Sequence, residues 1–294
     1  MPQINLSQLP VPAVVEALDY ETILAAMLAD LQARDPVFTA LVESDPAYKI
    51  LEVAAYREVL IRARVNDAAK AVMLPYAAGP DLDNLAALYG ATRLVIDPGD
   101  ADAIPPIPPT MESDEAFRAR TLLALDAVTT AGSVASYRYH ALSASGSVKD
   151  VGVATLSSGS VNVAVLATGA TGIPDGPLLA TVVAALNAER VRPLCDTVYV
   201  QAAQVFDYTI DANIKIYPGA DGQQALAAAQ VAAQSFVDAH FYLGYDIVLS
   251  GLMSALHQPG VQRVILPSWT DIVCDWSQAA RCTGITITLT GVDQ

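Results

Sequence analysis

The chain has 294 residues, of which 53% are hydrophobic and only 6% aromatic, so it can bury a large core and is expected to form more than one domain. Sixteen lysines and arginines against 31 acids give a formal net charge of −15, and no basic cluster is present. Such a chain is repelled by a phosphate backbone and by an anionic membrane surface. We therefore expect no nucleic acid and no membrane among its partners.

The sequence also argues against export and membrane insertion. Residues 1–6 lack the basic start and apolar stretch of a signal peptide. The longest apolar run, around 178–186, is far shorter than the roughly 20 residues of a transmembrane helix. The cysteines, Cys195, Cys274 and Cys282, form no CxxC pair, as is usual for reduced proteins. We expect a soluble cytoplasmic chain.

The first third of the chain reads as helix. Asp19 can cap a helix that ends at Asp35-Pro36, because the residue before a proline disfavours helical backbone angles. The apolar face of this helix consists of Ile23, Leu24, Met27, Leu28 and Leu31.

Asp45-Pro46 opens a second helix, with the proline at the first helical position where its missing N–H costs nothing. Running to Pro75, this helix would span roughly 45 Å at about 1.5 Å per residue, which exceeds what a small globule needs. Its polar face carries the potential ion pair Glu58–Arg62. An apolar stripe, spaced by three, four or seven, is predicted to pack on a partner helix: Ile50, Ala54, Ile61, Val65, Ala68 and Val72.

A change of composition follows a short helix that opens at Pro80-Asp81 and ends near Gly90. Residues 95–112 are acidic and rich in proline, which favours an extended, semi-rigid backbone. We interpret this segment as a connector, and as the hinge if the protein changes shape. The hinge candidates are its prolines: Pro98, Pro105, Pro106, Pro108 and Pro109.

The remaining chain mixes helices and strands. Ser113 caps a helix, a second helix carries Tyr137 and His140, and after residue 146 the apolar period changes to two. The predicted strands and helices are a hairpin around 148–165, helices at 177–190, 221–242 and 250–257, and strands at 197–200, 206–216, 261–266 and 285–289. Tyr137, Tyr139 and the 206–216 strand can equally be internal core or interface.

These patterns predict an α+β protein, elongated and multi-domain. We expect an N-terminal helical bundle part with a long helix over 1–94, a connector over 95–112 and a helical segment over 113–145. Residues 146–294 are expected to form α+β domains with small mixed sheets and a role in oligomerisation.

Few residues point to catalysis or to a metal. His140, His240 and His257 have no histidine or cysteine at metal-ligand spacing, and surface or capping roles explain them. Residues 168–172 (TGATG) follow a strand but lack the lysine of a phosphate-binding loop. Cys195 has no histidine near it in sequence, and Asp81 with Asp83 suits a helix N-terminus. We expect no catalytic residue, no cofactor and no metal.

Several short stretches, in a fixed order, carry a family resemblance. They are 81–86 (DLDNLA) with Arg93 downstream, 112–120 (ESDEAFRAR), 131–133 (AGS) with 137–141 (YRYHA), 148–151 (VKDV), 192–196 (RPLCD) and 260–264 (GVQRV). The chain resembles the baseplate protein J family of contractile phage tails, in particular its short form in temperate myophages and R-type bacteriocins. The resemblance covers essentially the whole chain. Cys195 departs from the small polar residue expected before Asp196.

The resemblance implies a structural role in the baseplate wedge. Family members join, two copies to one copy of a second wedge protein, in a trimeric unit, and six such units form a ring around the central hub and spike. The ring links the sheath to the tail fibres and opens to trigger contraction. The implied partners are a second copy, the second wedge protein, neighbouring wedges, the sheath-initiator or lysozyme-like wedge protein, the hub and spike, and the tail fibres. The implied location is a virion or bacteriocin particle.

Two other functions remain open from the sequence alone. One is a stand-alone α+β enzyme or ligand-binding protein, with Cys195 or His257 as catalytic residue and 168–176 as the ligand loop. The other is an oligomeric adaptor outside phages. A concave site with convergent polar groups would favour the enzyme, and large apolar surfaces would favour the wedge protein.

Overall fold

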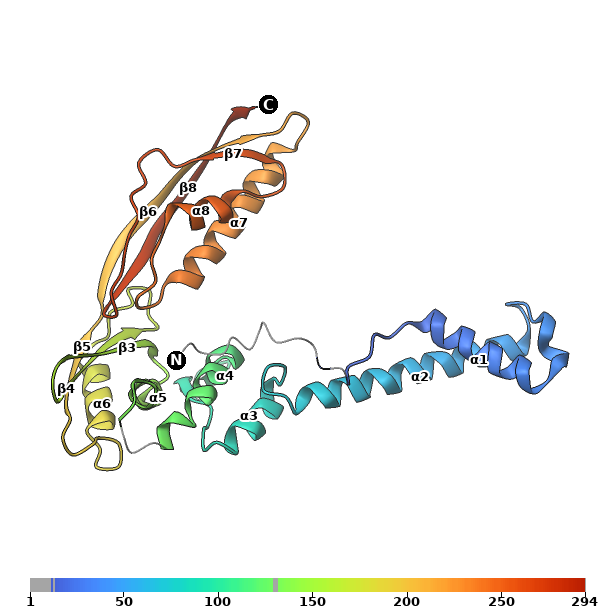
Figure 1. Ribbon diagram of the computed structural model, residues 1–294, viewed down its shortest axis with the longest axis horizontal. Coiled ribbons are helices and arrows are strands. Elements are labelled where there is room, and N and C mark those ends of the chain that lie inside the picture. Colours follow the sequence, from blue (N-terminus) through green and yellow to red (C-terminus); the bar gives the residue numbers. More distant parts are fainter. Residues whose placement is uncertain (1–11, 13, 129–131, 294) are drawn as a thin grey trace. The chain divides into compact units, whose positions relative to one another are not determined.

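The computed structural model describes residues 12, 14–128 and 132–293, and its chain divides into two compact units, 1–92 and 93–294 (Figure 1). The class is α+β, as predicted, with helices beside small sheets of two and three strands. Among the described residues, no helix is both long and apolar enough to cross a bilayer.

The first unit is helical. Helix α1 (Tyr20–Arg34) packs along α2 (Pro46–Ala71), with the short 3-10 turn η2 (Pro36–Ala40) between them and α3 (Gly79–Ala87) following. The Asp19 carboxylate accepts a hydrogen bond from the Thr22 N–H at 3.0 Å, which confirms the predicted cap of α1. Leu24, on the predicted apolar face, is buried against α2. Helix α2 ends four residues before Pro75, because the chain turns through the Met73 N–H bond to the Lys70 carbonyl.

The second unit begins with a hairpin where an extended connector was expected. Strands β1 (Val95–Asp97) and β2 (Thr110–Met111) pair antiparallel, and Asp100 and Ile107 exchange two backbone hydrogen bonds between them. The prolines permit this because the bonds use N–H groups of other residues. The segment 95–112 therefore folds back on itself inside the second unit.

The next layer is a three-stranded sheet covered by helices. Strands β3 (Val148–Ser157) and β4 (Ser160–Ala167) form the predicted hairpin, and β5 (Thr197–Ala202) adds parallel to β4. Helices α4 (Asp114–Leu123), α5 (Val134–Ala144) and α6 (Gly176–Leu186), with the 3-10 turn η3 (Asp126–Val128), complete this part. Tyr137 and Phe117 are fully buried, which places Tyr137 in the core.

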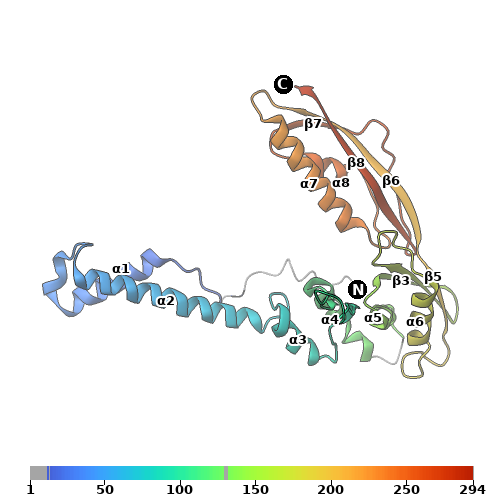
Figure 2. The ribbon, with the colours of Figure 1, turned by 180° about the vertical axis from the view of Figure 1, so that it is seen from behind.

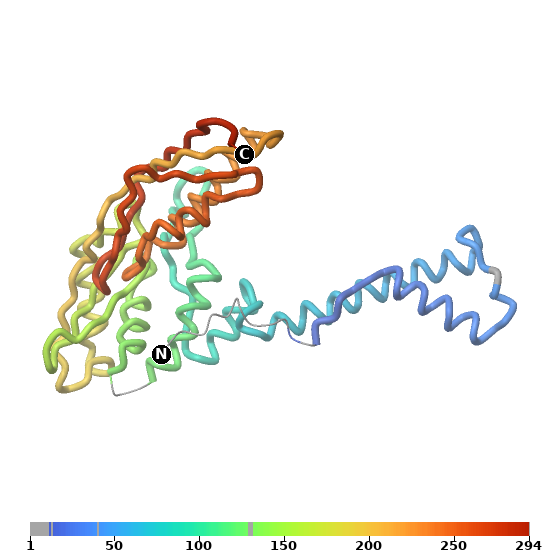
Figure 3. Tube along the Cα trace, turned by 45° about the horizontal axis from the view of Figure 1, so that its top comes forward, coloured from blue at the N-terminus to red at the C-terminus, as the bar shows by residue number. Residues whose placement is uncertain are grey.

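The last sheet has the order β7-β6-β8. Strand β6 (Gln204–Ile216) lies at its centre, antiparallel to β7 (Val261–Ile265) and parallel to β8 (Gln278–Val292). Helices α7 (Gly222–His240) and α8 (Leu249–Leu256) cover one face (Figure 2), and α7 runs along the strands (Figure 3).

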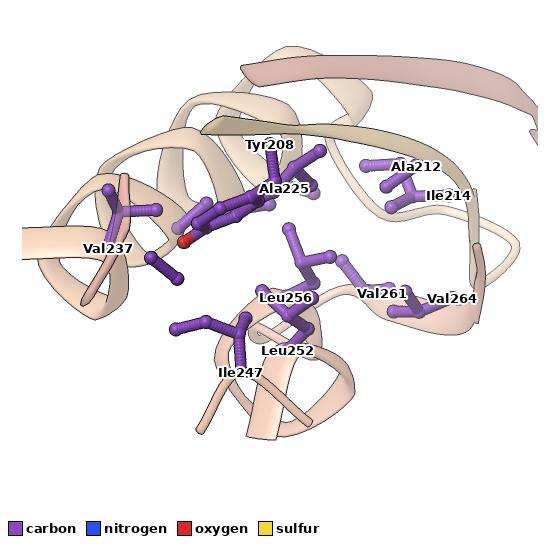
Figure 4. Close-up of a cluster of buried hydrophobic side chains, with 14 of the residues drawn as sticks. Tyr208, Ala212, Ile214, Ala225, Val237, Ile247, Leu252, Leu256, Val261 and Val264 are labelled. Carbon is purple, nitrogen blue, oxygen red and sulfur yellow. The ribbon is translucent and has the colours of Figure 1, made fainter. Parts of the chain in front are cut away.

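The alternation of β6 places its apolar side chains under these helices. Tyr208, Ile210, Ala212 and Ile214 are buried with Leu252 and Leu256 of α8, and the Tyr208 hydroxyl points toward Val237 (Figure 4). The alternation is therefore core within this chain from Tyr208 to Ile216, whereas Phe206 at its start is exposed.

Candidate functional site

Within the described residues, helix α2 (Pro46–Ala71) packs against the chain on one side and is exposed on another. On the side that packs within the chain, Ala55 is completely buried. The Asn66 side-chain amide makes two hydrogen bonds to the backbone of Glu16: its Oδ1 accepts from the Glu16 N–H at 3.0 Å, and its Nδ2 donates to the Glu16 carbonyl at 2.9 Å. Arg62 adds ion pairs to Glu16 at 2.9 Å and to Glu58 at 2.7 Å. The segment before α1 is thus anchored to the polar face of α2, which carries the predicted Glu58–Arg62 pair.

The apolar stripe of α2, defined as Ile50, Ala54, Ile61, Val65, Ala68 and Val72, lies on another side of the helix. Ile50 is 68% exposed, Ile61 65%, Val65 56% and Val72, just past the helix end, 68%. Four large aliphatic side chains on one line of a helix are costly to leave in water. Exposed apolar patches of this kind mark surfaces that contact other proteins.

Arg93 and the 112–120 stretch, which belong to the family resemblance, form buried polar contacts in the second unit. Arg120 and Glu112 are both buried and form a two-pronged ion pair, with 2.7 Å from Nη2 to Oε2 and 3.0 Å from Nε to Oε1. Arg93 donates to the Glu112 carbonyl at 2.7 Å and pairs with Asp114 at 2.7 Å. Both guanidinium groups lie about 5 Å from the Phe117 ring centroid, at 4.9 and 5.1 Å. These residues fix the β1–β2 hairpin to α4.

Removal of Arg120 is expected to destabilise the second unit strongly. Arg120→Ala leaves the Glu112 carboxylate buried without its main counter-charge, which costs about 3–5 kcal/mol of unfolding free energy. Urea unfolding measures the loss. Glu115→Ala on the same helix, at an exposed position, serves as control and should change stability by under about 0.5 kcal/mol. Equal urea midpoints for Arg120→Ala and Glu115→Ala would contradict the stabilising role of the Arg120–Glu112 ion pair.

A second set of family residues joins the two sheets. Asp150, buried on β3, accepts from Arg138 at 2.9 Å and from the Leu243 N–H at 3.0 Å. Lys149 places its ammonium 4.1 Å from the Phe241 ring centroid, and desolvation lowers the pKa of this lysine. Gly152 lies so close to the Trp276 carbonyl that a Cβ would approach its oxygen to 1.9 Å.

Tyr137 and Asp196 form a third such contact, since the Tyr137 hydroxyl donates to the Asp196 carboxylate at 2.8 Å. Burial, followed by this bond, raises the pKa of Tyr137. The neighbouring Cys195 is exposed, so the departure from the family pattern at this position does not alter the bond.

The histidines and the 168–176 loop that were considered for catalysis make packing, capping and backbone contacts within the chain. His240 stacks on Phe236, and His257 follows α8 as its C-cap. His140 packs edge-on to Tyr139, and burial lowers its pKa. The 168–176 loop closes through a bond from the Gly172 N–H to the Gly169 carbonyl, and Arg281 donates to the Ala170 carbonyl at 3.2 Å. In the described part of the chain, no three His, Cys, Asp or Glu side chains gather as a metal site would require.

Sequence reasoning missed the long-range partners of these groups. Nothing in the spacing of Arg120 and Glu112, or of Tyr137 and Asp196, reveals that they meet. Their membership of the recurring family stretches is the only signal that singled them out.

Comparison with known proteins finds similarity to baseplate proteins in the family models and in a curated relative. The family model for the baseplate J-like N-terminal domain matches residues 43–100, and the model for the baseplate J-like central domain matches residues 129–202. A chain in the cryo-EM structure of the anti-feeding prophage baseplate matches 60% of this chain, with a TM-score of 0.42 and 14% identity, and this chain spans 44% of that one. Baseplate protein J of Escherichia phage P2 is 44% identical over 302 residues, covering the whole of both chains. The chain therefore belongs to the baseplate protein J family, as the order of its motifs predicts.

Proposed function

We propose that this chain is a structural component of a contractile-tail baseplate, in the wedge unit that forms the ring around the hub. The family membership supports the baseplate role, and the observation that carries the wedge role is the exposed apolar stripe of α2. The role is one of assembly, with function residing in interfaces and not in catalysis.

The partner we propose for the stripe is a helix bundle made with a second copy of the chain and one copy of a second wedge protein. The stripe from Ile50 to Val72 would extend over about 33 Å at about 1.5 Å per residue, which suits a long helical contact. Positions 54, 61 and 68 repeat every seven residues, the period of helices that pack side by side over several turns. The stripe has small residues at positions 54 and 68, where a neighbouring helix can approach closely.

We propose further partners for the chain within the assembled particle. Six wedge units would form the ring, with neighbouring wedges, the sheath-initiator or lysozyme-like wedge protein, the hub and spike, and the tail fibres as further partners. The particle, a virion or a bacteriocin, would be assembled in the host cytoplasm. Particles produced without this chain should lack the ring, and supplying the chain in trans should restore it. Electron micrographs that show a complete ring in its absence would refute the proposal.

Ring opening is proposed to use the 95–110 segment as a hinge, with Pro98, Pro105, Pro106, Pro108 and Pro109 limiting the paths of motion. The boundary between the compact units, at 92/93, lies directly before it. The described hairpin is held by the strand pairs Val95–Met111 and Asp97–Thr110 and by the Asp100–Ile107 bridge, so few backbone hydrogen bonds would have to break for it to open.

A disulfide across this ladder tests the hinge. Val95→Cys with Met111→Cys, at directly paired positions, should block sheath contraction when oxidised and permit it when reduced. Contraction is scored by electron microscopy after triggering. Unchanged contraction of the oxidised particles would exclude a hinge in this segment.

A further inference from the structure

Two arginines of α2 lie among its exposed apolar side chains without a counter-charge. Arg57 and Arg64 are both exposed, and within the described residues neither takes part in an ion pair or a side-chain hydrogen bond. By contrast, Lys49 and Arg62 of the same helix each pair with a carboxylate at 2.9 Å. Arginine is not deprotonated in proteins, so both guanidinium groups keep a full positive charge.

Both arginines lie on the side of α2 opposite to the one that the chain itself covers. Arg57 follows the buried Ala55 by two positions, and Arg64 precedes the buried Asn66 by two. Two positions turn a helix by about 200°, which is almost the opposite side. The two guanidinium groups therefore face away from the side on which Asn66 binds Glu16.

Apolar residues border the two arginines on both sides. On the surface of a helix, the nearest neighbours of a residue are three and four positions away. All four such neighbours of Arg57 are apolar: Val53, Ala54, Leu60 and Ile61. Three of these side chains are well exposed, with Val53 at 63%, Leu60 at 42% and Ile61 at 65%. Arg64 shares two of the four, and Asp67, three positions after it, forms no ion pair with it in the described chain.

The arginines also occupy contact positions of the seven-residue repeat. With residues 54, 61 and 68 as its first positions, the fourth positions are 50, 57, 64 and 71. First and fourth positions face the partner when long helices pack side by side. A helix that covers the apolar stripe of α2 therefore covers both guanidinium groups as well. A buried charge without a counter-charge is strongly destabilising, so the covering helix has to supply carboxylates.

We propose that the helix covering the α2 stripe carries two carboxylates, seven residues apart, that pair with Arg57 and Arg64. The inference rests on the proposed function and assigns the chemistry by which the second wedge protein is recognised. A second copy of this chain does not supply these groups, because a parallel copy in register brings the same arginines to the same layers. Two copies and one acidic helix place a carboxylate between two guanidinium groups at each layer, and a carboxylate has lone pairs enough for both.

The two arginines would then select which chains assemble. A bundle made only of copies of this chain would collect like charges at two layers, and that repulsion disfavours it. A helix with carboxylates at those layers removes the repulsion and adds charge-assisted hydrogen bonds. Polar residues at contact positions are a recognised means of fixing the register and the number of chains in a bundle. The mixed composition of the proposed wedge unit follows from this selection.

Charge reversal tests the pairing in the complex. R57E/R64E should lower the affinity for the second wedge protein by about 100-fold or more, because carboxylates then face carboxylates in an apolar interface. K49E/K70E changes the net charge by the same amount at the third positions of the repeat, outside the contact positions. This control should keep its affinity within about threefold, since exposed charges contribute little. Circular dichroism verifies that both variants keep their helices.

A chemical cross-link identifies the partner groups directly. R57K/R64K keeps both positive charges and introduces primary amines. A carbodiimide joins such an amine to a carboxylate in contact with it: the amide bond forms and the carbodiimide takes up the released water as a urea. In the complex, mass spectrometry should locate both cross-links on aspartate or glutamate residues of the second wedge protein, seven positions apart.

The outcomes separate this inference from the wedge role. If R57E/R64E binds as tightly as the unmodified chain, or K49E/K70E loses as much affinity, the pairing is refuted and the wedge role stands. Cross-links that do not reach the second wedge protein within an intact complex refute it in the same way. An unmodified chain that forms no complex refutes the wedge role, and this inference with it.

Discussion

Val65→Asp is expected to abolish assembly with the second wedge protein while the chain itself stays folded. Val65 is more than half exposed in the single chain, so the aspartate costs little there. In the proposed bundle the same carboxylate would be buried against apolar side chains without a counter-charge, at a cost of several kcal/mol. Affinity should fall by at least about 100-fold, since each 1.4 kcal/mol is a factor of about ten.

Tyr56→Asp provides a matched control for this experiment. Tyr56 and Val65 are equally exposed, at 56% each, and both belong to α2. Nine positions at about 100° each place them on opposite sides of the helix. Co-purification should therefore be lost for Val65→Asp and kept for Tyr56→Asp. Loss in both variants would show that any charge on α2 disrupts the complex, and retention in both would show that the stripe is not the interface.

Gly152→Ala is expected to be the most destabilising single-methyl change in the second unit. A Cβ at this position would lie 1.9 Å from the Trp276 carbonyl oxygen and 3.0 Å from its carbon. Both are backbone atoms, so the contact is relieved only by shifting the segment before β8 away from β3. We expect a loss of about 3 kcal/mol or more, or roughly 6–12 °C in Tm.

Gly169→Ala is the control for the glycine experiment. A Cβ there would meet no atom within 4 Å, and the residue does not have a positive φ. Thermal unfolding should separate the two variants clearly. A Gly152→Ala protein that melts with the Gly169→Ala protein would mean that the two sheets are not held as closely as the structure describes.

The local elements were predictable from sequence because their signals are local. Asp19, Ser113 and Asp221 each accept a hydrogen bond from a backbone N–H of the helix they precede. The alternation from Phe206 to Ile216 predicted β6 and its buried face within a few residues. Caps and period-two patterns act over a few residues, so the chain displays them directly.

The pairings of distant segments were not predictable in the same way. Strand β8 begins at Gln278, seven residues before the Ile285 that marked it in the sequence, because its first part gains its structure from pairing with Gln204–Tyr208. The 95–112 segment reads as an extended connector in the sequence because it is rich in proline, and its short hairpin pairing gives no local signal. Asn66 was not singled out in the sequence, and its burial depends on Glu16, fifty residues earlier.

For the candidate site, the sequence identified the apolar stripe of α2 but not which side of the helix the chain itself uses. The six stripe positions have the spacing of a buried face, and that spacing alone does not distinguish an internal partner from an external one. The structure separates the two sides, because α1 and Glu16 occupy the side of Ala55 and Asn66.

The central claim, a wedge unit assembled through the α2 stripe, is tested most directly by the mass of the complex. The chain should be co-expressed with the second wedge protein of the same particle, purified and measured by light scattering. We predict a stable complex that contains two copies of this chain and one copy of the partner. A chain that purifies without the partner, with its mass unchanged by the partner's presence, would contradict the claim.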